Sequence, residues 1–321
     1  MDEKLITPME TPPHAGMLWI SGGTFQMGSD RHYPEEAPAH HATVDSFWMD
    51  TTLVTNLEFR HFVNATGYVT VCEVPPVESQ YPGALPELLV AASVVFVPPP
   101  GQVGLEDPYQ WWQFIAGANW RQPQGPGSTV QGKDNHPVVH IAWPDAEAYA
   151  AWSGKEIATE AEWEFAARGG LDGAEYAWGA NFTPDGVHQA NTWQGKFPSE
   201  NLEEDGFAGT SPVASFPSNG YGLHDMIGNV WEWTKSSYAQ HYLATEVNPC
   251  CGSVSRSRDP QQQGSSSDEP VIGIARHVMK GGSHLCAPNY CQRYRPAARM
   301  AQNTDTSTSH LGFRCIVRAP S

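Results

Sequence analysis

The sequence of 321 residues predicts a single α+β domain in which little of the chain forms regular secondary structure. It has 30 glycines and 27 prolines along its whole length, a distribution typical of a domain rich in turns. Its twelve tryptophans indicate a core built largely from aromatic side chains. Helical signals are confined to three short segments. We expect residues 1–15 to be a disordered leader and residues 16–321 to form one domain.

The first elements expected are two short strands in MLWISGGTFQMGS, which starts at Met17 and turns at residues 21–23. A helix is expected in TNLEFRHFVNATG, where Thr55 can cap the first turn while Glu58 reaches back to it. The apolar residues that fall on one face of this helix are Phe59, Phe62 and Val63. Gly67 can then end the helix in a left-handed turn.

A second helix is expected in TEAEWEFAARGG, with Thr159 and Glu162 as its capping box and the glycines at 169–170 as its stop. Its apolar stripe is Trp163, Ala166 and Ala167. Between these two helices, WPDAEAYAAWSG predicts a third short helix, because Pro144 and Asp145 suit a first turn. These helices are expected to be scaffolding.

Two long stretches carry no clear pattern of regular structure. Residues 73–108 are rich in proline and valine. Residues 244–277 include the polar, low-complexity run SRSRDPQQQGSSSDEP. We interpret the second stretch as a flexible polar insertion near residues 250–275.

Charge and composition exclude some classes of function. A formal charge of −17 argues against a nucleic-acid partner, because phosphate binding requires clustered Lys and Arg. No apolar run is long enough for a membrane span, and MDEKLITPMETPPHAG lacks the features of a signal peptide. We therefore expect a cytoplasmic protein, in which the six cysteines are thiols or metal ligands rather than disulfides.

Two of those cysteines, Cys286 and Cys291, lie five residues apart in GGSHLCAPNYCQRYRPAAR. They could form a disulfide, or a reactive thiol with a resolving partner. They could also hold zinc together with His284 or His310, or hold Cu(I), which accepts two thiolates in a line. Side chains flanking the pair that could shape a site are Ser283, Tyr290, Arg293, Arg295 and Arg299. The spacing alone leaves these alternatives open.

The segment GGSHLCAPNYCQRYRPAARMAQNTDTSTSHLGFRC resembles the C-terminal signature of the formylglycine-generating enzymes, also called sulfatase-modifying factors. Other stretches follow that family's order, among them ISGGTFQMGS, HPVVHIAWPDAEAYAAWSGK, TEAEWEFAARGG and EDGFAGTSPVASFPSNGYGLHDMIGNVWEW. The resemblance covers most of residues 17–315. The paired cysteines in the GGS-x-x-C-x4-C-x-R-Y-R setting resemble the bacterial-type, copper-dependent oxidase branch. The family resemblance as a whole implies a compact fold related to C-type lectins.

The resemblance implies that the protein oxidises one cysteine of a partly unfolded client sulfatase to Cα-formylglycine, within a Cys-x-Pro-x-Arg motif. The implied oxidant is O2 and the implied cofactor is Cu(I), with Cys286 and Cys291 as ligands and the client thiolate as a third. Ser283 and Trp231 are expected to line the oxygen and substrate pocket, with Tyr290 beside the metal. Candidates for client contacts are Trp112, Trp120 and His310.

Two structural calcium sites are also implied, since calcium takes hard oxygen donors. Each combines two side chains with two backbone carbonyls. The first set is Asn191, Asp205, Thr192 and Phe207. The second set is Asp225, Glu232, Gly228 and Val230. The alternative interpretation is that these acids only cap turns.

The chain departs from the family pattern in places. Residues 156–158 read Glu-Ile-Ala where Arg-Leu-Pro is usual, which affects local stability more than the site. Ala150 stands opposite Cys315, and Ala167 opposite Pro296, where secreted eukaryotic relatives have disulfides. These replacements agree with a reducing compartment.

Two alternative functions keep the same fold. One is a lectin-like, calcium-binding interaction module, which the cysteine pair argues against. The other is an oxidase that acts on a different thiol client. We expect a monomer, and we expect Cys72, Cys250 and Cys251 to be bystanders.

Overall fold

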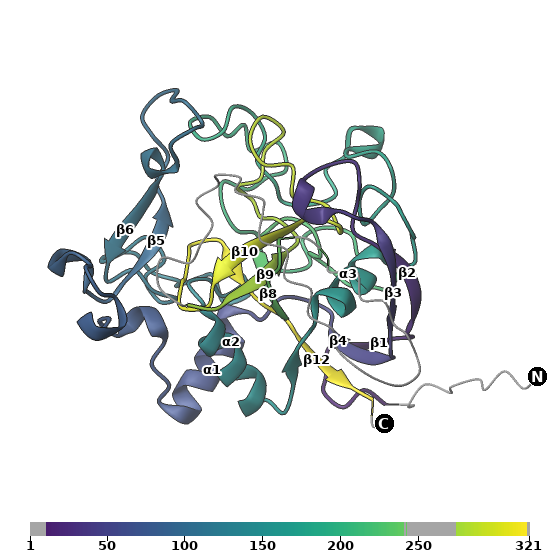
Figure 1. The fold of residues 1–321 in the computed structure, drawn as a ribbon, viewed down its shortest axis with the longest axis horizontal. Helices are drawn as coiled ribbons and strands as arrows, with labels where there is room; N and C mark the ends of the chain where they lie inside the picture. The colour runs from purple at the N-terminus through teal and green to yellow at the C-terminus, as the bar shows by residue number, and fades with distance from the viewer. Residues whose placement is uncertain (1–10, 241, 243–273, 320–321) are drawn as a thin grey trace, which may run out of the picture.

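The structure is a computed structural model that describes residues 11–240, residue 242 and residues 274–319 (Figure 1). This described part contains four small sheets and three α-helices, with much of the chain in turns between them. The architecture confirms the prediction of an α+β fold of low regular content. Most of the predicted leader, most of the insertion near residues 250–275, and both Cys250 and Cys251 lie outside the described residues.

Two four-stranded sheets join distant parts of the chain. The first is antiparallel, and its strands in spatial order are β1 (Met17–Ile20), β4 (Phe47–Asp50), β12 (Cys315–Arg318) and β7 (Glu156–Ile157). The second has the order β10 (Arg299–Asn303), β9 (Arg276–Lys280), β8 (Trp231–Ser237) and β11 (Leu311–Gly312). In the second sheet, β11 pairs with β8 in parallel and the other pairs are antiparallel.

Two antiparallel pairs complete the strands of the described part. They are β2 (Gly23–Met27) with β3 (His40–Val44), and β5 (Ala92–Phe96) with β6 (Trp112–Ala116). The two predicted N-terminal strands are confirmed as β1 and β2, which pair with different partners. β5 falls in the stretch 73–108, for which the sequence predicts no element. Its apolar run is held by pairing with β6, a partner that follows only after a proline-rich loop.

The three predicted helices are confirmed as α1 (Asn56–Thr66), α2 (Trp143–Trp152) and α3 (Glu160–Arg168). At the start of α1, Thr55 Oγ1 accepts from the Glu58 amide at 3.3 Å, and the Glu58 carboxylate accepts from the Thr55 amide at 2.8 Å. α3 begins with the same reciprocal cap, and both helices end at a left-handed glycine. Short 3₁₀ helices are η1 (Pro34–Glu36), η2 (Val71–Glu73), η3 (Glu78–Gln80), η4 (Pro86–Leu88), η5 (Pro108–Gln110) and η6 (Pro184–Gly186).

The core is aromatic, as the tryptophan count predicts. Phe59 of α1 is fully buried and meets Trp120, Phe313 and Tyr149 with ring centroids 5.3, 6.4 and 5.9 Å away. Edge-to-face contacts, as with Trp120 and Phe313, and stacked contacts, as with Tyr149, contribute about 0.5–1.5 kcal/mol each beyond the area that they bury. The core therefore ties α1 to α2 and to the C-terminal segment.

Buried ion pairs connect α3 to the strands on either side of the cysteine segment. Lys280, the last residue of β9, donates to Glu164 at 2.9 Å, and both side chains are fully buried. Arg299, the first residue of β10, pairs with Glu160 at 2.7 Å. Removing one partner of a buried pair costs about 3–5 kcal/mol. These pairs therefore fix where the chain leaves β9.

The unusual Glu156 of β7 finds cationic partners. Its carboxylate pairs with Arg318 of β12 and lies 3.3 Å from Lys235 Nζ. The change to an acidic residue at position 156 therefore reverses the charge there, and the new charge still has partners. Cys72 and Cys315 are buried free thiols, in agreement with the absence of a disulfide partner at Ala150. Within the described ranges, no helix is long and apolar enough to cross a membrane.

Candidate thiol active site

The two cysteines of the C-terminal signature meet in a tight turn after β9. Cys286 Sγ and Cys291 Sγ lie 3.3 Å apart, and neither is in a disulfide. The amide of Cys286 donates to the Ser283 carbonyl at 2.9 Å, and the amide of Cys291 donates to the Ala287 carbonyl at 2.9 Å. These turns bring the sulfurs together although the two cysteines are five positions apart in the chain.

Glycine is required where the chain enters this turn. Gly281 and Gly282 have φ angles of 92° and 72°, in the left-handed region. A Cβ on Gly282 would lie 2.8 Å from the Arg293 carbonyl oxygen, and a Cβ on Gly281 would lie 3.1 Å from the Trp163 ring. The glycine pair lets the turn pack against both α3 and the returning chain.

The pair is buried and shares a proton. Cys286 and Cys291 are 2% and 9% exposed. The hydrogen bond from the Cys286 thiol lowers the pKa of Cys291 to about 6, and the positive charge of Arg293 acts in the same direction. Burial raises the pKa of Cys286 well above its usual range, and its bond to Cys291 adds to this. These shifts favour a Cys286 thiol that donates to a Cys291 thiolate.

The structure separates the roles of the three flanking arginines. Arg293 Nη1 lies 4.0 Å from Cys291 Sγ. Arg295 instead forms a bidentate pair with Glu36 of η1, and Arg299 pairs with Glu160 of α3. Only Arg293 contacts a sulfur among these three side chains.

Tyr290 forms an aromatic wall beside the pair with two residues that the sequence does not single out. Its ring stacks on Phe197 at 4.6 Å and 6°, and meets the edge of Trp111 at 5.5 Å. Tyr290 is 39% exposed, whereas Trp111 is fully buried. The adjacent tryptophans at 111–112 were a usable signal for this wall, but their spacing does not show which of the two rings meets Tyr290.

Other predicted site residues lie at varying positions around the pair. Ser283 is buried, and its amide donates to Cys286 Sγ at 3.4 Å. Trp231 of β8 is buried in the same core cluster as both cysteines.

His310 and Trp112 contact each other, with ring centroids 4.7 Å apart. Trp120 is almost fully buried against Phe59, so it lies in the core rather than on an open face.

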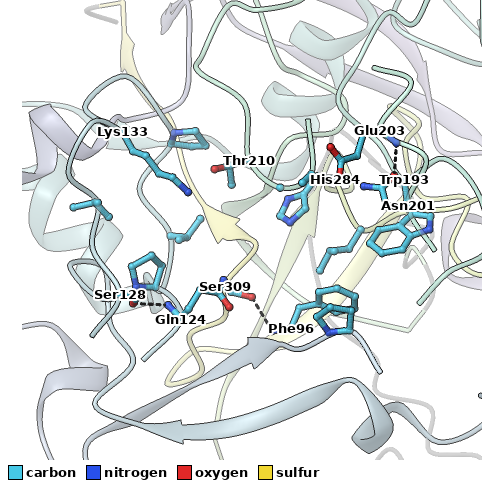
Figure 2. A pocket seen from close by; sticks show the side chains of 18 of the residues that line it. Phe96, Gln124, Ser128, Lys133, Trp193, Asn201, Glu203, Thr210, His284 and Ser309 are labelled. Atoms are coloured by element: carbon cyan, nitrogen blue, oxygen red, sulfur yellow. Dashed lines mark hydrogen bonds between the residues drawn. The ribbon is translucent and has the colours of Figure 1, made fainter. Parts of the chain in front are cut away.

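The structure offers no support for a zinc site on the pair. His284 Nδ1 bonds the Asn229 carbonyl at 2.7 Å, and its ring faces a separate cavity (Figure 2). His310 Nδ1 is 2.7 Å from Thr308 Oγ1. Within the described ranges, no three His, Cys, Asp or Glu side chains are close enough together to hold a metal ion. Two soft thiolates without further ligands suit Cu(I) instead.

The four residues of the first predicted calcium site lie in one compact loop. Asp205 Oδ2 accepts from the Thr192 amide at 2.9 Å, and Asp205 Oδ1 accepts from the Phe207 amide at 3.0 Å. Asn191 Oδ1 is buried and has no hydrogen-bond partner among the described residues. A buried acceptor without a donor is costly unless a cation or water meets it. The free Asn191 Oδ1 agrees with a cation at this set, although Gln194 Nε2 donates to Asp205 Oδ2 and to the Thr192 carbonyl.

The second predicted set is less suited to calcium in this arrangement. Both oxygens of Glu232 accept from Arg314 at 2.8 Å, and one also accepts from Trp163 at 3.0 Å. Asp225 Oδ2 accepts from the Ala214 amide at 2.7 Å. Arg314 already balances the charge of Glu232. The carbonyls of Gly228 and Val230 stay predicted calcium ligands only.

The fold and the paired thiols define a class of protein: a turn-rich α+β domain with a buried, disulfide-free cysteine pair. Comparison with known proteins agrees. The sequence profile of the Sulfatase-modifying factor enzyme 1-like domain matches residues 2–319. The chain is 50% identical to a formylglycine-generating enzyme of Mycobacterium tuberculosis, over 92% of this chain and 96% of that protein. The chain belongs to this family.

Two further comparisons qualify what membership means. The chain is 40% identical to an inactive Cα-formylglycine-generating enzyme 2 of Mus musculus, over 94% of this chain and 86% of that protein. The solved structure of PvdO from Pseudomonas aeruginosa aligns with a TM-score of 0.58 at 22% identity, covering 94% of each chain. The second likeness supports the fold alone. Family membership therefore leaves the activity to be argued from the site.

Proposed function

We propose that this protein converts a cysteine of a client sulfatase into formylglycine, with O2 as the oxidant. The names of its relatives support the reaction class, but one of them is called inactive. The observation that carries the proposal is the buried pair of free thiols, Cys286 and Cys291, with sulfurs 3.3 Å apart. A binding module needs no such pair, and a structural role would be met by a disulfide or an apolar pair.

The donor set of this pair fits Cu(I). Thiolates are soft ligands, and a monovalent copper ion is stable with two of them. When bound by Cys286 and Cys291, copper would supply the electron-transfer chemistry with oxygen. Ion binding requires the shared proton of the pair to leave, because the ligand form of each cysteine is the thiolate.

The surrounding residues prepare the pair and exclude water. The Ser283 amide fixes the Cys286 sulfur, and the Arg293 guanidinium stabilises negative charge on the Cys291 sulfur. Core residues, including Trp231, close the inner side. Tyr290 is the exposed residue of the aromatic wall. A client cysteine therefore reaches the thiol pair from the side on which Tyr290 lies. His310 and Trp112 are further candidates for contacts with the client chain.

The first calcium set supports this arrangement from outside. Asn191 and Trp193 flank Thr192, and the Trp193 amide donates to the Cys286 carbonyl at 3.0 Å. A calcium ion on Asn191 and Asp205 would order the loop that makes this contact. Its role is structural, not catalytic.

The experiment that tests the proposal uses two matched peptides, incubated with copper-loaded protein, a reductant and air. One contains Cys-Thr-Pro-Ser-Arg, and the other replaces its cysteine with serine. An aminooxy probe, which reacts with aldehydes, should label the first peptide only. Labelling of neither peptide by a protein that binds copper would point to an oxidase with another thiol client. Absence of both labelling and copper binding would leave the lectin-like module as the better description.

A further inference from the structure

A cavity of about 430 Å³ lies beside the segment that leads into Cys286 (Figure 2). This size is within the range of roughly 300–1,000 Å³ found for small-molecule sites. His284 and Leu285 form part of its wall, and the cysteines do not. Its apolar lining includes Phe96, Trp193 and Leu285. The cavity is therefore distinct from the thiol pair, although both use the same stretch of backbone.

The His284 ring presents an acceptor to this cavity. Its Nδ1 lies 2.7 Å from the carbonyl oxygen of Asn229, which can only accept, so Nδ1 carries the proton. In a neutral imidazole the other nitrogen, Nε2, then has a lone pair. No described residue pairs with Nε2, and His284 is 8% exposed. Figure 2 shows the ring facing the cavity, so Nε2 is available to a donor group of a bound molecule.

Two charged side chains of opposite sign also line the cavity. Figure 2 shows Lys133 pointing into it at one end, Glu203 at the other end, and Thr210 and His284 between them in that view. Neither Lys133 nor Glu203 forms an ion pair with another described residue. A simple anion would meet the Glu203 charge and the His284 lone pair. A simple cation would meet Lys133.

We propose that the cavity binds a small zwitterion of amino-acid or short-peptide chemistry with an apolar side chain. Its ammonium group would donate to His284 Nε2 and face Glu203, and its carboxylate would pair with Lys133. Its side chain would pack on Phe96 and Trp193. In this proposal both charges come from free termini, so the ligand is a free small molecule rather than an internal polypeptide segment. This site does not depend on formylglycine formation.

The test measures binding of three probes to the full-length protein by isothermal titration calorimetry. They are the dipeptide Ala-Phe, its N-acetyl form, which lacks the ammonium, and its C-terminal amide, which lacks the carboxylate. The dipeptide should bind at least roughly tenfold more tightly than either analogue, because each analogue leaves one charged group unpaired. Equal binding of all three probes, or binding of none, overturns the proposal.

Variants assign each charge to its residue. Lys133→Met should weaken dipeptide binding by roughly tenfold and leave the amide analogue unaffected. Glu203→Gln should weaken the dipeptide and leave the N-acetyl analogue unaffected. Matched controls are Lys196→Met and Glu200→Gln, exposed residues near the cavity that do not line it. The same loss in the controls would show that net charge, not the cavity, governs binding, and would also overturn the proposal.

Discussion

Arg293 and Glu35, 258 positions apart in the chain, form an ion pair at 2.5 Å that holds the Arg293 guanidinium 4.0 Å from Cys291 Sγ. The Tyr33 ring covers the same guanidinium, with its centroid 3.8 Å from Cζ. The segment before and within η1 therefore completes the environment of a cysteine near the C-terminus. Both ends of the domain must therefore fold together before the Arg293 charge lies beside the Cys291 sulfur.

Replacing either cysteine of the pair should abolish turnover and copper binding. In Cys286→Ser or Cys291→Ser only one soft ligand remains, and one thiolate does not hold Cu(I) tightly. Copper bound per protein, measured after gel filtration, should fall from near one to near zero. The double variant Cys250→Ser/Cys251→Ser is the control and should keep full copper and near-native activity. Full activity in either single variant of the pair would sink the copper assignment.

Loss of Arg293 should make Cys291 less reactive as a nucleophile. Without the guanidinium the pKa of Cys291 rises from about 6, so less thiolate is present near neutral pH. Alkylation of the apo protein by iodoacetamide at pH 7 should slow by roughly threefold to tenfold in Arg293→Met. Glu35→Gln should give a smaller effect in the same direction, since it only releases the arginine. Arg318→Met removes a paired arginine remote from the cysteines, and an equal slowing in that variant would refute the assignment.

Acid should destabilise the fold through its buried histidines. His140 is fully buried between Ser93 Oγ at 2.7 Å and the Pro123 carbonyl at 2.9 Å, and burial lowers its pKa to about 4. A folded-state pKa below the unfolded value of about 6.5 means stability that is complete above pH 6.5 and lost as the pH falls toward 4. The loss from this residue alone is about 2 kcal/mol at pH 5.

This prediction is checked by urea denaturation at about pH 7.5 and about pH 5. The wild-type free energy of unfolding should be lower at about pH 5 than at about pH 7.5. This difference between the two pH values should be about 2 kcal/mol smaller in His140→Gln. Burial also lowers the pKa of His284 and His310, to about 4 and about 3, so part of the acid loss should persist in the variant. An unchanged pH difference in His140→Gln would contradict the account of His140.

Removal of calcium should lower the melting temperature. Asn191 Oδ1 has no donor, so an ion that meets it stabilises the folded state in proportion to its occupancy. A chelator should lower the Tm by about 5 °C or more, and added calcium should restore it. Asp205→Asn should remove this response, while Asp185→Asn, an exposed control, should keep it. If chelator does not change the Tm of the wild-type protein, the first predicted calcium site is refuted.

The helices were predictable because their signals are local. Thr55, Glu58 and Gly67 are within one helix length of each other, so the sequence contains the whole capping device. The same is true of the spacing that singles out Cys286 and Cys291. Strand β5 was not predictable in this way, because a short apolar run becomes a strand only when a distant partner pairs with it.

The surroundings of the thiol pair are equally nonlocal. Three arginines follow Cys291 closely, and no pattern in the sequence shows that only Arg293 approaches the sulfur. That outcome depends on Glu35 and Glu36, which enter from the other end of the domain. The cavity beside His284 is likewise built from segments far apart in the chain. Charge pairing between remote segments is a property of the packed structure, which is why the sequence did not reveal it.

The most direct test of the central claim is the mass of a peptide containing Cys-Thr-Pro-Ser-Arg after incubation with copper-loaded protein, a reductant and air. Conversion of the cysteine to an aldehyde should lower the peptide mass by about 18 Da, the difference between CH₂–SH and CHO, at that residue alone. The Cys286→Ser variant should leave the mass unchanged. An intact peptide from wild-type protein carrying one copper would contradict formylglycine formation on this motif. Conversion by the Cys286→Ser variant would contradict the role of the pair.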